Sequence, residues 1–357
     1  MKDQIINKFK SILYPNFKKD IISLNLVKNI EIKDNIAYIT LDIFSSNKDI
    51  IKELENNILN SLKEFNLKDI KLTINHPEAP KEQSNSQSGR NLAPQIKHFI
   101  MVSSGKGGVG KSTTTVNLAI SMAKMGKRVG LLDLDIYGPN IPRMLGIMDE
   151  APKIQGDKIY PILSHGIYTM SMGVLISPGQ GLVWRGAMIM KAVTQLLTDV
   201  LWGDLDIMFL DMPPGTGDAQ LSLAQNVPVS AGVCVSTPQA VSLDDTRRSL
   251  DMFDKLHIPV AGIVENMSGF LCPDNGKLYD IFGSGGAEKL AKEYNIDILA
   301  NIPIEMPIRI GADEGKPISF YDSTSLSSKK YLLACEKILN FLNNLNNIDN
   351  SAIQPIY

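Results

Sequence analysis

The sequence predicts a doubly wound α/β domain with a mostly parallel sheet, preceded by a small α+β domain. Three observations support the larger domain: a glycine-rich turn between a strand and a helix, further short apolar runs, and helical patterns that alternate with them. The runs suit strands buried on both faces; they are RVGLLDLD (128–135), IMFLD (207–211), GVCVS (232–236) and VAGIVE (260–265). Helical patterns cover 185–201, 239–256 and 284–294.

Composition divides the chain into four segments. Residues 1–76 predict the small domain: a helical opening, two strands around a turn at 33–35, a helix over 47–66 and the strand LKDIKLTIN. Residues 77–95 are rich in Pro, Ser, Gln and Asn, which predicts a flexible linker. Residues 96–345 form the α/β domain, with a last helix over 328–342, and 346–357 form an Asn-rich tail.

The overall composition is that of an ordinary globular protein. Of the 357 residues, 44% are hydrophobic and 21% are charged, and the net charge is −2. This charge argues against a chain-wide nucleic-acid-binding surface. No apolar run reaches the ~20 residues that span a bilayer, and three cysteines do not make a disulfide framework. We therefore expect a cytoplasmic protein with neither a nucleic acid nor a membrane as its partner.

The stretch HFIMVSSGKGGVGKSTT (98–114) organises the larger domain. Gly105, Gly110, Lys111 and Ser112 match the phosphate-loop pattern G-x-x-x-x-G-K-[ST] in full, which predicts a P-loop NTPase domain. Glycines let backbone N–H groups close around phosphate oxygens, the lysine neutralises the terminal phosphates, and the serine ligates Mg²⁺. The rest of the predicted nucleotide site is formed by Gly107, Gly108, Val109 and Thr113.

A dinucleotide-binding loop is the rival interpretation of this stretch. Gly105, Gly107 and Gly110 also satisfy G-x-G-x-x-G, and Asp133 lies near the ~20-residue offset of a ribose-binding acid. A dehydrogenase loop does not require Lys-Ser directly after the third glycine. The phosphate loop is therefore the better interpretation.

Acidic residues end two of the predicted strands. Asp133 and Asp135 close one strand in LLDLDIYGPN, and Asp211 closes another in FLDMPPGTGD. Carboxylates that converge on a phosphate loop are costly unless a cation is present, and Mg²⁺ bound to a nucleoside triphosphate supplies it. We expect Ser112, Asp133 and Asp211 to hold Mg²⁺. Gly215 lies where a backbone N–H that senses the γ-phosphate would be needed.

Lys106 makes the pattern more specific, because an ordinary phosphate loop tolerates any residue there. GKGGVGKS, with DLDIYGP and DMPPGTGD, resembles the deviant Walker A ATPases, which include nitrogenase iron protein and the MinD and ParA ATPases. The resemblance implies ATP as the nucleotide and a homodimer in which Lys106 reaches the partner's nucleotide. It also implies that Asp135 positions the attacking water, so that Lys106, Lys111 and Asp135 are catalytic, and that Asn266 recognises adenine.

Within this class the sequence is similar to the Mrp/ApbC branch, the iron–sulfur cluster carrier ATPases. The resemblance runs from about residue 96 to 320, and its segments are DLDIYGPNIPRMLG, WRGAMIMKA, DMPPGTGDAQLSL, VENMSGF, IFGSGGAEKLA and IPIEMPIRIGADEGKPI. The N-terminal segment resembles the small iron–sulfur assembly domain that is often fused ahead of such ATPases. Together these resemblances imply delivery of clusters from donor proteins to apo-proteins.

One position departs from that branch. Relatives carry Cys-Pro-x-Cys after the VENMS strand, where two such pairs from a dimer hold one [4Fe–4S] cluster. This chain reads Cys272-Pro273-Asp274-Asn275. A dimer therefore offers two thiolates, with Asp274 as a candidate substitute ligand. Cys234 and Cys335 fit buried core positions better than ligand positions.

These patterns leave three functions open. The first is a homodimeric ATPase that carries an iron–sulfur cluster bridging two subunits. The second is a positioning ATPase of the MinD/ParA type, although the tail NNLNNIDNSAIQPIY has no basic amphipathic helix for a membrane. The third is a metal-free, ATP-switched scaffold that binds a partner through the Cys272 loop.

Overall fold

The chain divides into two compact units, Met1–Glu82 and Gln83–Tyr357. The computed structural model describes residues 2–14, 20–24, 26–43, 48–65, 67–75, 92–135, 138–156, 158–172, 186–217, 220–221, 224 and 227–351. Most of the predicted linker, and the last residues of the predicted tail, lie outside these ranges. Each unit is described by itself.

The smaller unit pairs a three-stranded sheet with two helices. Its elements are α1 (Lys2–Phe9), β1 (Val27–Lys33), β2 (Ile36–Asp42), α2 (Lys48–Leu62) and β3 (Asp69–Asn75). The predicted turn joins β1 to β2: Asp34 and Asn35 have φ of 50° and 63°, a conformation that short polar side chains tolerate. β2 pairs antiparallel with β1 and parallel with β3, so α2 is the crossover between two parallel strands.

This unit has a hydrophobic core of its own. Leu54, Ile58 and Leu62 lie on one face of α2, are fully buried, and pack with Ile39 and Leu41 of β2. Alternate residues of β2 face this core, which is the pattern of a sheet covered on one side.

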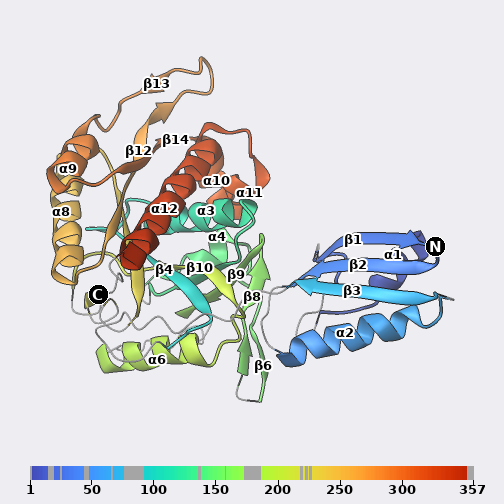
Figure 1. Cartoon of the computed structure of the whole chain (residues 1–357). Coiled ribbons are helices and arrows are strands. Elements are labelled where there is room, and N and C mark those ends of the chain that lie inside the picture. Colours follow the sequence, from blue (N-terminus) through green and yellow to red (C-terminus); the bar gives the residue numbers. More distant parts are fainter. Residues whose placement is uncertain are drawn as a thin grey trace. The chain divides into compact units, whose positions relative to one another are not determined.

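The larger unit is built on a nine-stranded, mostly parallel sheet with the strand order β13-β12-β11-β4-β10-β5-β9-β8 and with β14 paired to β12 (Figure 1). The doubly wound fold predicted from the sequence is confirmed. The main parallel strands are β4 (Ile96–Ser103), β5 (Val129–Asp133), β9 (Ile167–Ser171), β10 (Leu205–Asp211), β11 (Val229–Ser236), β12 (Val260–Leu271) and β14 (Ile298–Ile304). The principal helices are α3 (Lys111–Lys124), α6 (Gly186–Thr198), α8 (Ala240–Lys255), α9 (Gly286–Tyr294) and α12 (Leu326–Ser351).

Alternation along β11 shows that helices cover both faces of the sheet. Val233 and Val235 lie in the core that α3 and α12 share with the sheet. Gly232, between Ala231 and Val233 of that core, faces the other way, because a Cβ atom added to it would lie within 2.9 Å of the Phe253 ring on α8. α3 and α12 therefore pack on one face and α8 packs on the other.

Short elements that the sequence did not predict complete the unit. They are α4 (Ile141–Met144), β6 (Lys153–Gln155), β7 (Lys158–Tyr160), β8 (Ile162–Ser164), β13 (Leu278–Tyr279), α10 (Met306–Glu314) and α11 (Ile318–Tyr321). β6 and β7 form a separate hairpin, and β8 pairs antiparallel with β9 at the sheet edge. No helix within the described ranges has both the length and the apolar character to cross a bilayer.

The last helix is longer than predicted. It runs from Leu326 to Ser351, well past the expected end at Leu342 and into the predicted tail. Tyr331, Ile338 and Leu342 anchor it in the core beside α3. Once a helix is anchored in this way, each added residue costs little, so asparagines of modest helix propensity extend it.

Two glycines hold α4 against the turn between α10 and α11. Gly146 and Gly315 both have positive φ, 64° and 71°. A Cβ atom added to Gly315 would lie 2.4 Å from the Cα atom of Gly146, so the two backbones are already in contact. Gly315 therefore leaves no room for a side chain on the facing side, whereas a Cβ atom on Gly146 would make a tight contact of 3.3 Å.

Gly315→Ala therefore combines a left-handed backbone with a clash against backbone, and we expect it to cost about 3 kcal/mol of the free energy of unfolding. Gly156→Ala is the matched control: Gly156 has φ of 60° but nothing within 4 Å of the added Cβ among the described residues, so about 1 kcal/mol is expected. Urea unfolding followed by tryptophan fluorescence measures both, because Trp202 is buried in the core of the larger unit. Equal losses of unfolding free energy in the two variants would contradict the close contact between Gly315 and Gly146.

Candidate nucleotide-binding site

The glycine-rich turn connects β4 to α3 and depends on its glycines in two ways. Gly108 and Gly110 have φ of 82° and 83°, which other residues rarely adopt. A Cβ atom on Gly110 would lie 2.1 Å from Nδ2 of Asn266, and one on Gly105 would lie 2.1 Å from the backbone of Asp245. Around Gly107, by contrast, no described atom lies within 4 Å of such a Cβ position. The loop is therefore packed against the protein on one side and open on the other.

The first turn of α3 offers a site for an anion. Gly110 is the N-cap residue and supplies no side-chain hydrogen bond, and the first turn contains no acidic residue. Backbone N–H groups at such a helix start carry partial positive charge and favour phosphate. Thr113 in this turn is half-buried, with its Oγ1 atom 3.9 Å from Sδ of Met144 on α4.

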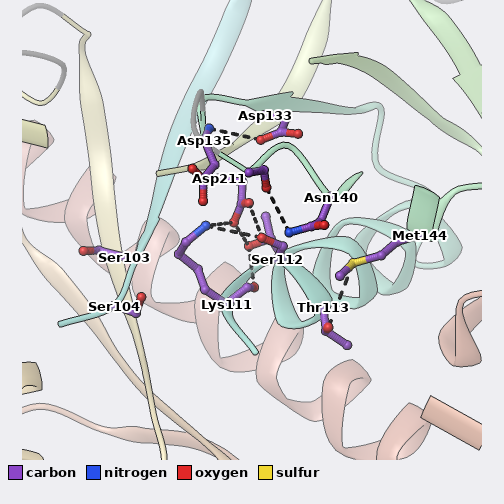
Figure 2. Close-up of polar contacts among 12 residues, drawn as sticks. Ser103, Ser104, Lys111, Ser112, Thr113, Asp133, Asp135, Asn140, Met144 and Asp211 are labelled. Atoms are coloured by element: carbon purple, nitrogen blue, oxygen red, sulfur yellow. Dashed lines mark hydrogen bonds and ion pairs between the residues drawn. The ribbon is translucent and has the colours of Figure 1, made fainter. Parts of the chain in front are cut away.

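Asp211 is the centre of the polar cluster below the loop (Figure 2). Its fully buried carboxylate lies 2.8 Å from Nζ of Lys111, and it accepts hydrogen bonds from the hydroxyls of Ser112 at 2.6 Å and Thr115 at 2.7 Å. Lys111 is itself 6% exposed. A buried charge needs such partners, because removing one of them leaves it unpaired in a poorly solvated site.

Sheet register places Asp133 beside Asp211. The two residues are direct partners in the parallel pairing of β5 with β10. Asp133 accepts hydrogen bonds from Oγ of Ser171 at 2.8 Å and from the backbone N–H of Asp135 at 3.1 Å. Burial, reinforced by the charge of Asp211, raises the pKa of Asp133 well above its ordinary value. A cation between these carboxylates would relieve their repulsion.

These residues fit a magnesium ion that is shared with a nucleotide. Ser112, Asp133 and Asp211 supply a hydroxyl and two carboxylates, and Mg²⁺ in nucleotide sites takes its other ligands from phosphates and water. Asp135 is half-buried beyond the strand end, and its backbone N–H donates to Asp133. Across the described residues, no group of three or more His, Cys, Asp or Glu side chains is arranged to hold a metal by itself.

Lys106 and Gly215 are both connected to Ser104, at the start of the loop. Lys106 is half-buried, and its backbone carbonyl accepts a hydrogen bond from Oγ of Ser104 at 3.0 Å. Gly215 has φ of 90°, and its N–H donates to the carbonyl of Ser104 at 2.9 Å. The structure thus brings Lys111, Ser112, Asp133 and Asp211 together, while Lys106 is joined to Gly215 through Ser104.

Asn266 contacts the loop itself. It lies on β12, is 8% exposed, and donates from Nδ2 to the backbone carbonyl of Val109 at 2.8 Å. This contact holds the phosphate loop; the adenine recognition that the resemblance implies at this position stays a prediction. The next residue, Met267, has φ of 58°, and the pairing of β12 with β14 shifts register between Asn266 and Phe270.

Cys272 begins the tip of the hairpin that β12 forms with β13. Its backbone N–H donates to the carbonyl of Lys277 at 2.9 Å, and its carbonyl accepts from Gly276 N–H at 2.9 Å. Cys272 is half-buried, whereas Asp274 and Asn275 are exposed. Figure 1 shows the hairpin projecting beyond the rest of the sheet. The other two cysteines are fully buried, as predicted: Cys234 and Cys335.

Sequence patterns missed two residues of the site. Thr115 lies one helical turn after Lys111, so the period of the helix was the available signal. Ser171 ends β9, a short strand whose sequence IYTMS gave little sign of its place beside β5.

Comparison with known proteins identifies the family. Residues 95–339 match the ParA family model described as the NUBPL iron-transfer P-loop NTPase. The chain belongs to this family. The resemblance to the iron–sulfur carrier ATPases is confirmed, since the NTPase is 48% identical to the iron-sulfur cluster carrier protein of Helicobacter pylori, over 99% of this chain and 97% of that protein. It is 40% identical to the carrier protein of Escherichia coli K12, over 89% of this chain and 86% of that protein.

Solved structures agree with this family. The nucleotide-binding protein of Archaeoglobus fulgidus, solved in complex with ADP, is 38% identical to the NTPase; the TM-score is 0.56, over 62% of this chain and 88% of that protein. MinD from Pyrococcus furiosus gives a TM-score of 0.51 at 22% identity, over 68% of this chain and 99% of MinD, which shows the shared fold alone.

Substitutions at Lys111 and Asp135 should separate nucleotide binding from turnover. Lys111→Ala removes the phosphate counter-charge, and we expect ATP binding to fall by about 100-fold or more. It also leaves Asp211 without its ion-pair partner, so the thermal midpoint should fall. Asp135→Ala should bind ATP within about twofold of the wild type but lose turnover. Equilibrium binding and steady-state hydrolysis measure the difference; equal losses of affinity would refute these separate roles.

Proposed function

We propose that this P-loop NTPase is a homodimeric ATPase that carries iron–sulfur clusters and delivers them to apo-proteins in the cytoplasm. The observation that carries the proposal is the match to iron-transfer NTPases across a chain whose phosphate-loop residues surround Asp211. The two carriers from Helicobacter and Escherichia align with both units of this chain. All three cysteines are free thiols, which suits a reducing compartment.

The site geometry supports a mechanism for ATP hydrolysis. The backbone N–H groups at the start of α3 and the ammonium of Lys111 bind the phosphates. To do so, Lys111 leaves its ion pair with Asp211 and pairs with the phosphates instead. Ser112, Asp211 and Asp133 would hold Mg²⁺, which neutralises charge that develops on the phosphates. Asp135 lies past the buried pair and orients the attacking water. The Gly215 N–H, when released from Ser104, reaches the terminal phosphate.

The position of Lys106 favours the proposal that the protein is a dimer. In the described part of the chain, the ion pair to Asp211 is made by Lys111, which leaves the ammonium of Lys106 for another role. Lys106 directly precedes Gly107 and Gly108, which are exposed, so a second subunit could approach the nucleotide at this point of the loop. We infer that each subunit supplies Lys106 to the nucleotide of its partner.

Mixed dimers test this arrangement. Lys106→Ala alone and Asp135→Ala alone should each bind ATP and fail to hydrolyse it. A mixed dimer has one site with its own Asp135 and with Lys106 from the partner, so activity should return to roughly a quarter of the wild type in an equal mixture, by statistical pairing. Steady-state hydrolysis is measured after subunit exchange has been verified with two affinity tags. Absence of recovery in exchanged mixtures would show that Lys106 does not act across the interface.

The Cys272 hairpin is the proposed cargo site. Its tip is exposed, and the apolar side chains after it are about half exposed: Leu278 50%, Tyr279 46% and Ile281 56%. One thiol per subunit gives a dimer two thiolates for a cluster, and Asp274 or a client cysteine would complete the ligands. Weak ligation by the carrier favours transfer of the cluster to a client that offers more thiolates.

Anaerobic reconstitution with iron and sulfide tests the cargo site. Cys272→Ala should lose most of the bound iron while its ATP turnover stays within about twofold of the wild type. Cys335→Ala is the control, because that thiol is buried in the core and should leave iron binding unchanged. Asn275→Cys restores the second thiolate and should slow the loss of iron to a chelator.

A metal-free, ATP-switched scaffold is the second candidate function, and Asn275 in place of a second cysteine is the observation that favours it. Wild type that holds no more iron than Cys272→Ala would establish this alternative and overturn the carrier function.

A further inference from the structure

Two hydrogen bonds connect the segment after β10 to the end of β4 and the start of the phosphate loop, and a third lies within the phosphate loop. Nε2 of Gln220 donates to Oγ of Ser103 at 2.5 Å. The N–H of Gly215 donates to the carbonyl of Ser104 at 2.9 Å, and Oγ of Ser104 donates to the carbonyl of Lys106 at 3.0 Å. The DMPPGTGDAQ segment is thus tied at two points to the strand that leads into GKGGVGKS.

The hydrogen bond between Gln220 and Ser103 is buried. The Gln220 side chain is 1% exposed, and Ser103 is fully buried. Ser103 ends β4 and pairs with Cys234 in the middle of the sheet, so it is held by the core. Within the described structure, Oε1 of Gln220 is buried with no hydrogen-bond partner. A buried amide that is half satisfied costs about 1–3 kcal/mol, so packing alone does not favour glutamine here over an apolar side chain.

We propose that Gln220 is a positioning residue for ATP hydrolysis, an inference that rests on the hydrolysis proposed above. Its amide fastens the loop after β10 to the end of β4. Before nucleotide binds, Gly215 and Lys106 are joined through Ser104. When the Gly215 N–H leaves Ser104 for the terminal phosphate, the Gln220 contact is the attachment that still holds this segment at the end of β4. Gly215 faces the terminal phosphate in the proposed mechanism, and Lys106 acts on the partner's nucleotide.

The effect should fall on rate and not on affinity. Lys111 and Ser112, which bind the phosphates and the cation, are held by Asp211 through contacts that do not involve Gln220. Loss of the Gln220 contact leaves those groups in place and shifts Gly215 and Lys106. Small displacements of groups that act at the transition state cost rate while ground-state binding is kept.

A double-mutant cycle tests the inference on the full-length protein. Gln220→Met keeps the volume and removes the amide, and Ser103→Ala removes the acceptor. Each should lower kcat about tenfold with the Kd for ATP within about twofold, and the double variant should be no slower than either single one. Gln195→Met, on an exposed position of α6, is the matched control and should keep the kcat of the wild type.

Three results would overturn the positioning role: kcat within twofold of the wild type, parallel losses of kcat and ATP affinity, or additive losses in the double variant. A lower thermal midpoint with unchanged kcat would equally overturn it, since that is the signature of a packing role.

Hydrogen exchange separates this inference from the proposed function. The amides of residues 215–217 should exchange faster in Gln220→Met than in wild type or Gln195→Met when no nucleotide is added, because the loop has lost its attachment. A wild type without ATPase activity would refute the proposed hydrolysis. Hydrogen exchange would then test only whether Gln220 holds the segment after β10 in place. Faster exchange in Gln220→Met would support that attachment, and unchanged exchange would refute the attachment as well.

Discussion

The carboxylate of Asp211 is the constraint around which the larger unit is arranged. It lies fully buried at the end of β10 and is satisfied by Lys111, Ser112 and Thr115, all from the first turns of α3. Those partners reach it because β10 lies between β4 and β5 in the sheet. An unpaired charge at this depth costs several kcal/mol, on the order of 3–5. Strand order, loop geometry and the start of the helix are therefore mutually dependent, and the residues that bind phosphate also stabilise the fold.

Local patterns predicted much of this unit. The glycine spacing of the phosphate loop and the apolar runs ending in Asp133 and Asp211 are signals within one segment, and the structure has strands and a helix at these places. The contacts of Thr115 with Asp211 and of Gln220 with Ser103 join residues about a hundred positions apart, and a pattern within one segment does not identify the partner. Short strands such as β8 and β9 were missed because three to five residues give no clear period.

The strand β12 runs from the nucleotide site to the Cys272 hairpin. Asn266 donates to the carbonyl of Val109 in the phosphate loop, and Cys272 follows the end of the same strand. Between them the backbone departs from regular pairing at Met267 and Gly269, with φ of 58° and 86°. A bulge of this kind re-aims the residues that follow it. The hairpin thus leaves the sheet in a direction set directly after the contact with the loop.

The exposed tip of that hairpin has a consequence for how such proteins diverge. Asn275 bonds within its own turn, to Lys277 N–H at 2.9 Å and to the Tyr279 hydroxyl at 3.1 Å. Neither partner belongs to the nucleotide site or to the core. Exchange of asparagine and cysteine at this position is therefore nearly neutral for folding and for the phosphate loop. A single substitution here can therefore add or remove a thiolate at the tip without disturbing the nucleotide site.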